Sequence, residues 1–419
     1  MGQFEVRNGE LHAEGLSVRA IAESVGTPFY CYSTATMERQ YTEFADAFAA
    51  ADATVLYSVK ANSNISVIRT FGRLGAGADV VSGGEMQRAL VAGVPAERIV
   101  FSGVGKTRAE LAEGLQTGVL QFNVESEGEL TALAEVARSR GSVASVAIRV
   151  NPNIDAASHD KITTGRSHDK FGITWEHARH VYSEAAKMPS IRITGLAVHI
   201  GSQIESLKPF ASAFRAVAEL AAVLKGDGHD IVNLDLGGGL GIRYGNESPP
   251  TPQEYANVAI RETAGTGCRL FLEPGRVLVG SAGILVTEVL YEKAADGQRV
   301  VVVDAAMNDL IRPAMYGAQH EIVAVTPVIG AADSPADVVG PVCESSDRFA
   351  RNRPLPPVMP GDLLAIATAG AYGAVMASTY NSRLLVPEVL VNKHELAVIR
   401  PRPEYEDLIG ADVPAPWLA

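Results

Sequence analysis

Eight short apolar segments recur between residues 54 and 276, and segments with helical spacing lie between them. Each apolar segment is rich in Val, Ile and Leu and ends at Gly, Asn, Ser or a charged residue. Near-continuous apolar strands that alternate with amphipathic helices indicate parallel βαβ units. Eight such units over roughly 240 residues match a (β/α)8 TIM-like barrel, and a doubly wound open sheet is the alternative. The eight segments are residues 54–62, 77–85, 98–106, 119–126, 143–152, 191–201, 231–239 and 268–276.

The pattern changes after residue 278, where strand-like runs continue without helical intervals. Short strands with turn-rich connections are typical of antiparallel β structure. The run 351–361 contains four prolines and is therefore expected to be a surface loop. The fold class expected is α/β plus all-β: a barrel over residues 35–278, and a second, mainly antiparallel β domain formed by residues 1–34 and 279–419.

Composition narrows the classes of function. The 419 residues include 36 basic and 48 acidic side chains, so the net charge of −12 argues against a general binder of nucleic acid or anionic membranes. We expect no secretory signal, because the N-terminus lacks a basic run followed by an apolar one. No apolar run reaches the ~18 residues that a membrane span needs. Three cysteines without disulfide or zinc spacing fit a reducing, cytoplasmic setting.

The ends of the predicted strands carry most of the chemistry. Active sites of (β/α)8 enzymes lie at the carboxyl ends of the strands. The set suits an electrophilic cofactor that bears a phosphate, since it combines an amine, an imidazole, a carboxylate, a guanidinium and consecutive glycines. Its members are Lys60, Asp79, Ser82, Lys106, Glu125, Arg149, His199, Ser202, Gly237, Gly238, Gly239, Glu273 and Arg276.

Each of these residues also has an ordinary structural interpretation. Lys60 can act as an amine nucleophile in a pocket of low dielectric, or be a surface lysine at the start of a loop. The glycines 237–239 can form a phosphate-binding nest or a simple turn. His199 can stack on a ring or be a satisfied core histidine, and Glu273 can hold a proton on a pyridine nitrogen or cap a helix.

A metal site is not expected from the sequence. One loop gathers two histidines and two aspartates, but their spacing matches no ligand pattern that we identify. These residues are His159, Asp160, His168 and Asp169.

Eight strings, in their order and spacing, resemble the diaminopimelate decarboxylase family, whose members are fold-type III pyridoxal-phosphate enzymes with an alanine-racemase-like barrel and a β domain. The resemblance runs from about residue 27 to 395, and Ser58 stands where the family more often has Ala. The strings are YSVKAN, GADVVSGGE, KITTGRSHDKFGI, HIGSQI, LDLGGGLGI, EPGR, GPVCESSD and GAYGAVMASTYNSR.

The resemblance implies a role for each matching position. Lys60 would be the Schiff-base lysine, His199 would stack on the cofactor ring, and Glu273 would face the pyridine nitrogen. Cys343 would be a proton donor at Cα, although an isolated cysteine is more often a small buried apolar residue. The cofactor-binding set is Lys60, Asp79, His199, Ser202, Gly237, Gly238, Gly239, Glu273, Gly275, Arg276 and Tyr372. The substrate-binding set is Arg276, Arg312, Tyr316, Glu344 and Tyr372.

The activity that the resemblance implies is decarboxylation of meso-2,6-diaminopimelate to L-lysine and CO2, the last step of lysine biosynthesis, with pyridoxal 5′-phosphate as cofactor. It also implies a homodimer in which Cys343 and Glu344 reach the partner subunit's active site. Arginine side chains would bind the distal carboxylate of the substrate, and Glu344 its ammonium group. The alternatives are a decarboxylase for ornithine, arginine or carboxynorspermidine, a catalytically inactive homologue that binds a partner protein, and a barrel isomerase or aldolase without this cofactor.

Overall fold

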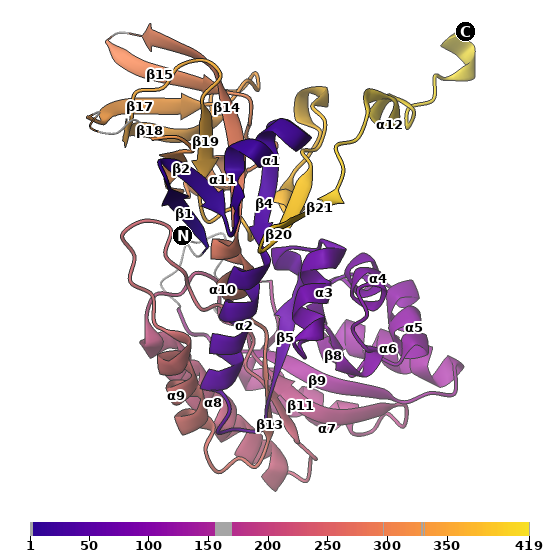
Figure 1. Ribbon diagram of the computed structural model, residues 1–419. Helices are drawn as coiled ribbons and strands as arrows, with labels where there is room; N and C mark the ends of the chain where they lie inside the picture. Colours follow the sequence, from indigo (N-terminus) through magenta and orange to yellow (C-terminus); the bar gives the residue numbers. More distant parts are fainter. Residues whose placement is uncertain (1–2, 156–169, 296, 328–329, 331, 419) are drawn as a thin grey trace. The chain divides into compact units, whose positions relative to one another are not determined.

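The computed structural model describes residues 3–155, 170–295, 297–327, 330 and 332–418 (Figure 1). Residue contacts divide the chain into two units, each described below by itself. The barrel unit comprises residues 38–243 and 247–278, and the β unit comprises residues 1–37, 244–246 and 279–419.

The barrel unit contains eight parallel strands that close on themselves. Their order is β9-β11-β12-β13-β5-β6-β7-β8, and β8 pairs with β9 to complete the ring. Each of the eight predicted segments overlaps one of these strands, so the predicted barrel is confirmed. The strands are β5 (Ala53–Ser58), β6 (Gly77–Val80), β7 (Ile99–Phe101), β8 (Gln121–Val124), β9 (Ala144–Asn151), β11 (Ile191–Ala197), β12 (Asn233–Asp235) and β13 (Arg269–Leu272). A further strand, β10 (Ile173–Thr174), pairs with β9.

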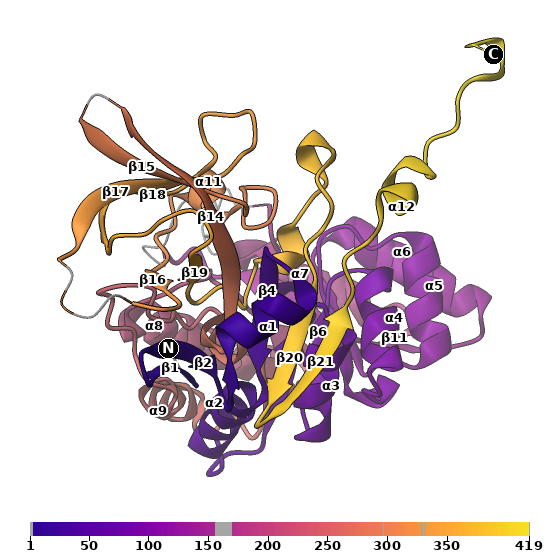
Figure 2. The same cartoon turned by 45° about the horizontal axis from the view of Figure 1, so that its top comes forward.

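Helices cover the outside of the barrel, and α3 to α6 lie side by side there (Figures 1 and 2). Polar residues at their N-termini explain where several begin. Thr107 and Thr251 each form a capping box with a glutamate three residues later, and the Ser82 side chain accepts a hydrogen bond from the Glu85 N–H. The helices are α2 (Thr34–Ala47), α3 (Ile65–Arg73), α4 (Gly83–Val91), α5 (Arg108–Thr117), α6 (Glu127–Ser139), α7 (Ala178–Ala185), α8 (Leu207–Gly226) and α9 (Pro252–Thr263). The short, buried α10 (Arg276–Val279) follows β13.

The β unit is organised around the long strand β14 (Gly283–Ala295). This strand pairs antiparallel with β4 (Phe29–Ser33), β15 (Gln298–Val303) and β19 (Leu363–Ile366). Two pairings are parallel, those of β15 with β17 and of β4 with β20. The remaining strands are β1 (Phe4–Arg7), β2 (Glu10–Ala13), β3 (Leu16–Ser17), β16 (Ile322–Ala324), β17 (Ser334–Val339), β18 (Arg348–Leu355), β20 (Glu388–Asn392) and β21 (Glu395–Arg400). Short helices are α1 (Val18–Val25), α11 (Arg312–Tyr316) and α12 (Tyr405–Ile409).

Alternation along β14 gives this sheet two apolar faces. Ile284 and Val286 belong to one buried cluster, which includes the N-terminal strands, whereas Leu285 and Val289 belong to another. Successive strand side chains point to opposite faces, so β14 contributes to both cores. The N-terminal segment thus packs within the β unit, and its strand β4 is an interior strand of the sheet.

The prediction of a loop over residues 351–361 is wrong in its first half. Residues 351–355 belong to β18, which pairs with β17 at the edge of the sheet (Figure 2). Pro354 lies opposite Pro335, which precedes the part of β17 that pairs with β15. Because proline lacks only an N–H group, it is tolerated on an edge strand. Residues 356–361 form neither helix nor strand, as expected.

Among the described residues, we find no helix whose length and apolar character would let it cross a membrane.

Candidate active site

The carboxyl ends of the barrel strands surround a cavity of about 460 Å³. Every strand of the barrel contributes at least one lining residue just beyond or near its end. Lys60, Ser82, Glu125, Arg149, His199 and Glu273, all predicted from strand ends, lie together here. The polar lining residues from the strands and their ends, in order from β5 to β13, are Lys60, Ser82, Ser102, Asn123, Glu125, Arg149, His199, Asp235 and Glu273, and Glu110 of α5 also lines the cavity.

Lys60 lies in a short 3-10 turn, η1 (Val59–Ala61), directly after β5. Its Nζ donates to Asp79 Oδ2 at 2.7 Å, and the Asp79 side chain is fully buried on β6. Burial raises the pKa of Asp79, but the Lys60 ammonium and the hydrogen bonds to this carboxylate outweigh it and leave the pKa below its ordinary value. Lys60, whose side chain is 32% exposed, is therefore an amine held at the cavity by a buried anion.

Ser58, which stands where the family more often has Ala, has a structural role beside Lys60. Its hydroxyl donates to Asp79 Oδ2 at 2.9 Å and lies 3.1 Å from the Glu273 carbonyl oxygen. An alanine at this position has no such hydroxyl, so Ser58 adds a hydrogen bond to the carboxylate that pairs with Lys60.

Two buried acids, Asp235 and Glu273, also line the cavity at this end of the barrel. Asn123 Nδ2 donates to Asp235 Oδ2 at 2.7 Å and lies 3.4 Å from Glu273 Oε1. Burial, together with the charges of Asp235 and Asp79, raises the pKa of Glu273 well above its ordinary range. Burial raises the pKa of Asp235 to about 6, against the hydrogen bond from Asn123. These carboxylates therefore retain a proton, or attract a cationic group, more strongly than exposed carboxylates do.

His199 is held in its neutral form by its surroundings. The Gly238 N–H donates to His199 Nδ1 at 3.1 Å, so that nitrogen carries no proton. Burial, followed by the positive charges of Arg149 and Lys60, lowers the pKa of His199 well below its ordinary value. The ring is thus an uncharged imidazole at the cavity wall.

The three glycines at 237–239 are required by close packing. A side chain at Gly238 would overlap the Glu273 carbonyl, and Gly237 and Gly239 have φ angles of 67° and 109°. The Gly237 N–H donates to Asp235 Oδ1 at 3.0 Å, and the Gly238 N–H to His199. The predicted nest thus uses two of its amide donors to orient neighbouring side chains.

Two arginines of the barrel unit are held by specific contacts. Arg276, the last residue of the EPGR segment and the first of α10, is 5% exposed and donates from Nη2 to Ser202 Oγ at 3.0 Å. Gly275 precedes it, and a side chain there would crowd Ser58 and Ala61 at 3.0 Å. Arg149 Nη1 donates to both Glu125 oxygens, at 3.0 and 3.1 Å.

The β unit carries the other predicted residues. Arg312 is 5% exposed, and its guanidinium carbon lies 4.8 Å from the Tyr244 ring centre and 5.9 Å from that of Tyr316. Its Nε donates to His320 Nε2 at 3.3 Å, while His320 Nδ1 lies 2.9 Å from the Ala367 carbonyl oxygen. For both bonds to form, the His320 proton must be on Nδ1. Arg312 is therefore a buried, oriented cation.

Cys343 and Glu344 are both exposed on a loop of the β unit. The loop is anchored by Asp347, which accepts hydrogen bonds from the Val342 and Met307 N–H groups, both at 2.7 Å. Exposure rules out the interpretation of Cys343 as a buried apolar residue. Tyr372 is half-buried and has a φ angle of 54°, unusual for a residue with a side chain.

Sequence reasoning missed several members of these networks. Asn123 and Asp235 line the cavity from strands β8 and β12, and Ser102 does so directly after β7. Tyr244 and His320 surround Arg312. Polar residues interrupting apolar runs were the available signal for the first three. The histidines and aspartates of the loop at 159–169, considered above for a metal, lie outside the described residues.

Comparisons with known proteins agree with this geometry. The model of the family described as "Pyridoxal-dependent decarboxylase, pyridoxal binding domain" matches residues 34–280. Diaminopimelate decarboxylase from Zymomonas mobilis is 47% identical over 420 residues, covering 99% of each chain, and that from Pseudomonas aeruginosa is 45% identical over 412 residues, covering 98% of this chain and 99% of its own.

Solved structures are similar too. Diaminopimelate decarboxylase from Helicobacter pylori complexed with L-lysine has a TM-score of 0.91 at 41% identity, covering 94% of this chain and 98% of its own. The enzyme from M. jannaschii in co-complex with L-lysine has a TM-score of 0.95 at 37% identity, covering 99% of both. With a lysine, a neutral histidine and buried acids at the mouth of a closed barrel, and with these relatives, the chain belongs to the diaminopimelate decarboxylase family of pyridoxal-dependent decarboxylases.

Proposed function

We propose that this protein decarboxylates meso-2,6-diaminopimelate to L-lysine and CO2, the last step of lysine biosynthesis, with pyridoxal 5′-phosphate as its cofactor. The observation that carries the proposal is the pair of Lys60 with buried Asp79 at a cavity that Glu273 also lines. The names of the relatives supply the substrate, and L-lysine, the expected product, is bound in both of the solved structures described above.

The residues of the barrel fit this cofactor. A cavity of about 460 Å³ lies within the usual range for small-molecule sites. We propose that the barrel domain, residues 35–278, binds the cofactor through Lys60, Asp79, His199, Ser202, the glycines 237–239, Glu273, Gly275 and Arg276, and that Tyr372 joins them. Since the amides of Gly237 and Gly238 already bond to Asp235 and His199, we assign phosphate binding mainly to Gly239, Gly275 and Arg276.

Bound pyridoxal phosphate supplies an electron sink for the charge left on the substrate when CO2 departs. The acid cluster of this chain supports that role. Glu273, with Asp235 and Asp79 nearby, favours a proton on any basic nitrogen placed beside it. His199, being neutral, can lie against an aromatic ring without adding a positive charge.

Substrate selection is assigned to the β domain, formed by residues 1–34 and 279–419. Arg312 is a buried, planar cation, which suits it to bind a carboxylate through two parallel hydrogen bonds. Substrates without a distal carboxylate, such as ornithine, lack the group that this guanidinium is proposed to bind, so we expect the enzyme to select against them. We assign Arg276, Tyr316 and Tyr372 to the same binding site, and Glu344 to the distal ammonium group.

We further propose a homodimer whose active sites are shared between subunits. Cys343, the proposed proton donor at Cα, and Glu344 are both exposed on the single chain, as residues that serve a partner's site would be. The free thiols of Cys31, Cys268 and Cys343 are compatible with the cytoplasmic location proposed for it.

Sharing is tested by mixing two inactive variants, Lys60→Ala and Cys343→Ala, under conditions that exchange subunits. Shared sites predict partial recovery of activity, because some mixed dimers contain one site with both native residues. If each subunit is self-contained, the mixture stays inactive and the shared site is wrong.

The cofactor assignment is tested with Lys60→Ala and a matched control, Lys208→Ala, an exposed lysine on α8. Wild type and the control should take up pyridoxal phosphate with a visible absorption band and release lysine from meso-diaminopimelate. Lys60→Ala should lose both properties. Turnover by Lys60→Ala at the control's rate would contradict the proposal.

A further inference from the structure

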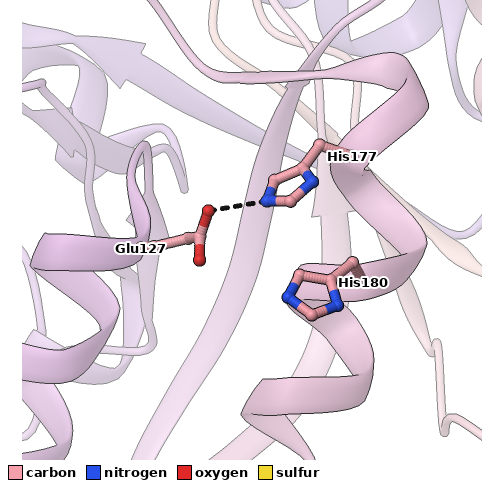
Figure 3. A group of neighbouring side chains, drawn as sticks. All are labelled: Glu127, His177 and His180. Atoms are coloured by element: carbon pink, nitrogen blue, oxygen red, sulfur yellow. Dashed lines mark hydrogen bonds and ion pairs between the residues drawn. The ribbon is translucent and has the colours of Figure 1, made fainter.

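Three side chains outside the proposed reaction gather on the surface of the barrel unit. Glu127 is the first residue of α6, His177 ends the 3-10 turn η4 (Trp175–His177), and His180 lies in the first turn of α7. All three are exposed. Figure 3 shows the His177 ring facing the Glu127 carboxylate, with His180 on the same side of its helix.

The possible ligand atoms of these side chains are close. One nitrogen of each histidine and one carboxylate oxygen all lie within 4.8 Å of one another. His177 Nε2 is 2.7 Å from Glu127 Oε1, and the two imidazole centres are 4.9 Å apart. A surface ion pair would account for the first contact, but it does not require His180 to bring a third ligand atom to the same point.

We propose that Glu127, His177 and His180 form a binding site for a divalent transition-metal ion such as Zn²⁺. Two imidazoles and one carboxylate suit zinc, copper, nickel and cobalt, whereas Mg²⁺ and Ca²⁺ prefer sets of oxygen ligands. Three protein ligands leave a fourth position for water. A metal on His177 Nε2 takes the place of the proton shared with Glu127 Oε1, and the other ring nitrogen, Nδ1, then carries the imidazole proton.

Small side-chain movements produce the required geometry. In a tetrahedral site with bonds of about 2.0–2.1 Å, neighbouring ligand atoms are roughly 3.3 Å apart. The contact between His177 and Glu127 is slightly shorter than this, and 4.8 Å is the upper limit for the rest. Exposed side chains can rotate by such amounts without disturbing the core.

The surrounding charges do not oppose a cation. Arg179, between the two histidines in sequence, donates to both oxygens of Asp227 at 2.8 Å. Lys187 is 2.6 Å from Glu184, the residue one helical turn beyond His180. A bound metal would join the beginnings of α6 and α7, and this role does not depend on the proposed decarboxylation.

The experiment is a titration of the purified holoenzyme with ZnCl2 in an isothermal calorimeter, in a buffer without phosphate. The variants are His177→Ala, His180→Ala and a matched control, His394→Ala, an exposed histidine of the β unit. His180→Ala is the decisive variant, because it leaves the hydrogen bond between His177 and Glu127 intact.

Wild type and His394→Ala should bind one Zn²⁺ per chain at this site, and both other variants should bind it at least tenfold more weakly. Zn²⁺ should raise the melting temperature of wild type more than that of His180→Ala. Saturable binding that is equal in wild type and His180→Ala, an absence of such binding, or equal affinity for Mg²⁺ would each overturn the proposal.

Discussion

Arg312 provides a sharp test of how substrate is selected. Its guanidinium is 5% exposed, lies beside the rings of Tyr244 and Tyr316, and donates to His320. It is therefore oriented before substrate arrives. A hydrogen bond to a charged group contributes about 1.5–3 kcal/mol, which corresponds to about 10- to 150-fold in kcat/KM. Arg312→Ala should lose at least this factor for diaminopimelate, mainly through a higher KM.

Arg312→Lys should fall between wild type and Arg312→Ala, because lysine keeps the charge but not the planar fork. The assay is steady-state kinetics at saturating cofactor, with melting temperature and cofactor absorption as checks on folding and loading. Arg351→Ala, an exposed arginine of β18, is the matched control. A KM for Arg312→Ala within twofold of this control would refute the assignment.

Three further predictions concern positioning residues, the acid cluster and the glycines. His320→Phe should raise KM several-fold by leaving a buried Arg312 donor without its acceptor, and His320→Gln should recover part of the loss; equal kinetics in both variants would exclude this positioning role. For cofactor-free protein, the raised pKa of Asp235 means that its protonated form stabilises the fold fully below pH 4, and that this stability is lost as pH rises through about 6. A pKa shift from about 4 to about 6 corresponds to about 3 kcal/mol. Urea unfolding between pH 4 and 7.5 should therefore show a smaller decline in the free energy of unfolding for Asp235→Asn than for wild type. An equal decline in both proteins would contradict this role of Asp235. Gly238→Ala should lower stability by about 1–3 kcal/mol and weaken cofactor binding, because its side chain overlaps the Glu273 carbonyl, whereas Gly128→Ala, which meets no neighbour within 4 Å, should do neither.

The barrel was predictable because each of its strands is an apolar run with a clear end. Strand β18 was not, since prolines normally argue against strands and only its edge position makes Pro354 acceptable. Lys60, His199 and Glu273 could be selected because barrel enzymes place their chemistry at strand ends. Asn123 and Asp235 were not selected, because they lie within apolar strands and a polar residue in such a strand is not by itself a sign of a functional site.

Contacts between distant parts of the chain account for the remaining omissions. His320 and Tyr244 are relevant to the site because they contact Arg312 in the folded chain, and no local sequence pattern predicts these contacts. The cluster of Glu127, His177 and His180 likewise combines residues about 50 positions apart in the sequence, and only the fold brings α6 next to the start of α7.

A substrate panel tests the proposed reaction and the proposed substrate together. Purified protein loaded with pyridoxal phosphate is given meso-diaminopimelate, ornithine, lysine or arginine at equal concentration, and CO2 and the amine product are measured. We expect lysine and CO2 from diaminopimelate and no turnover of the other three amino acids. Faster turnover of ornithine, lysine or arginine than of diaminopimelate would contradict this expectation and would remove Arg312 and Glu344 from the explanation of specificity.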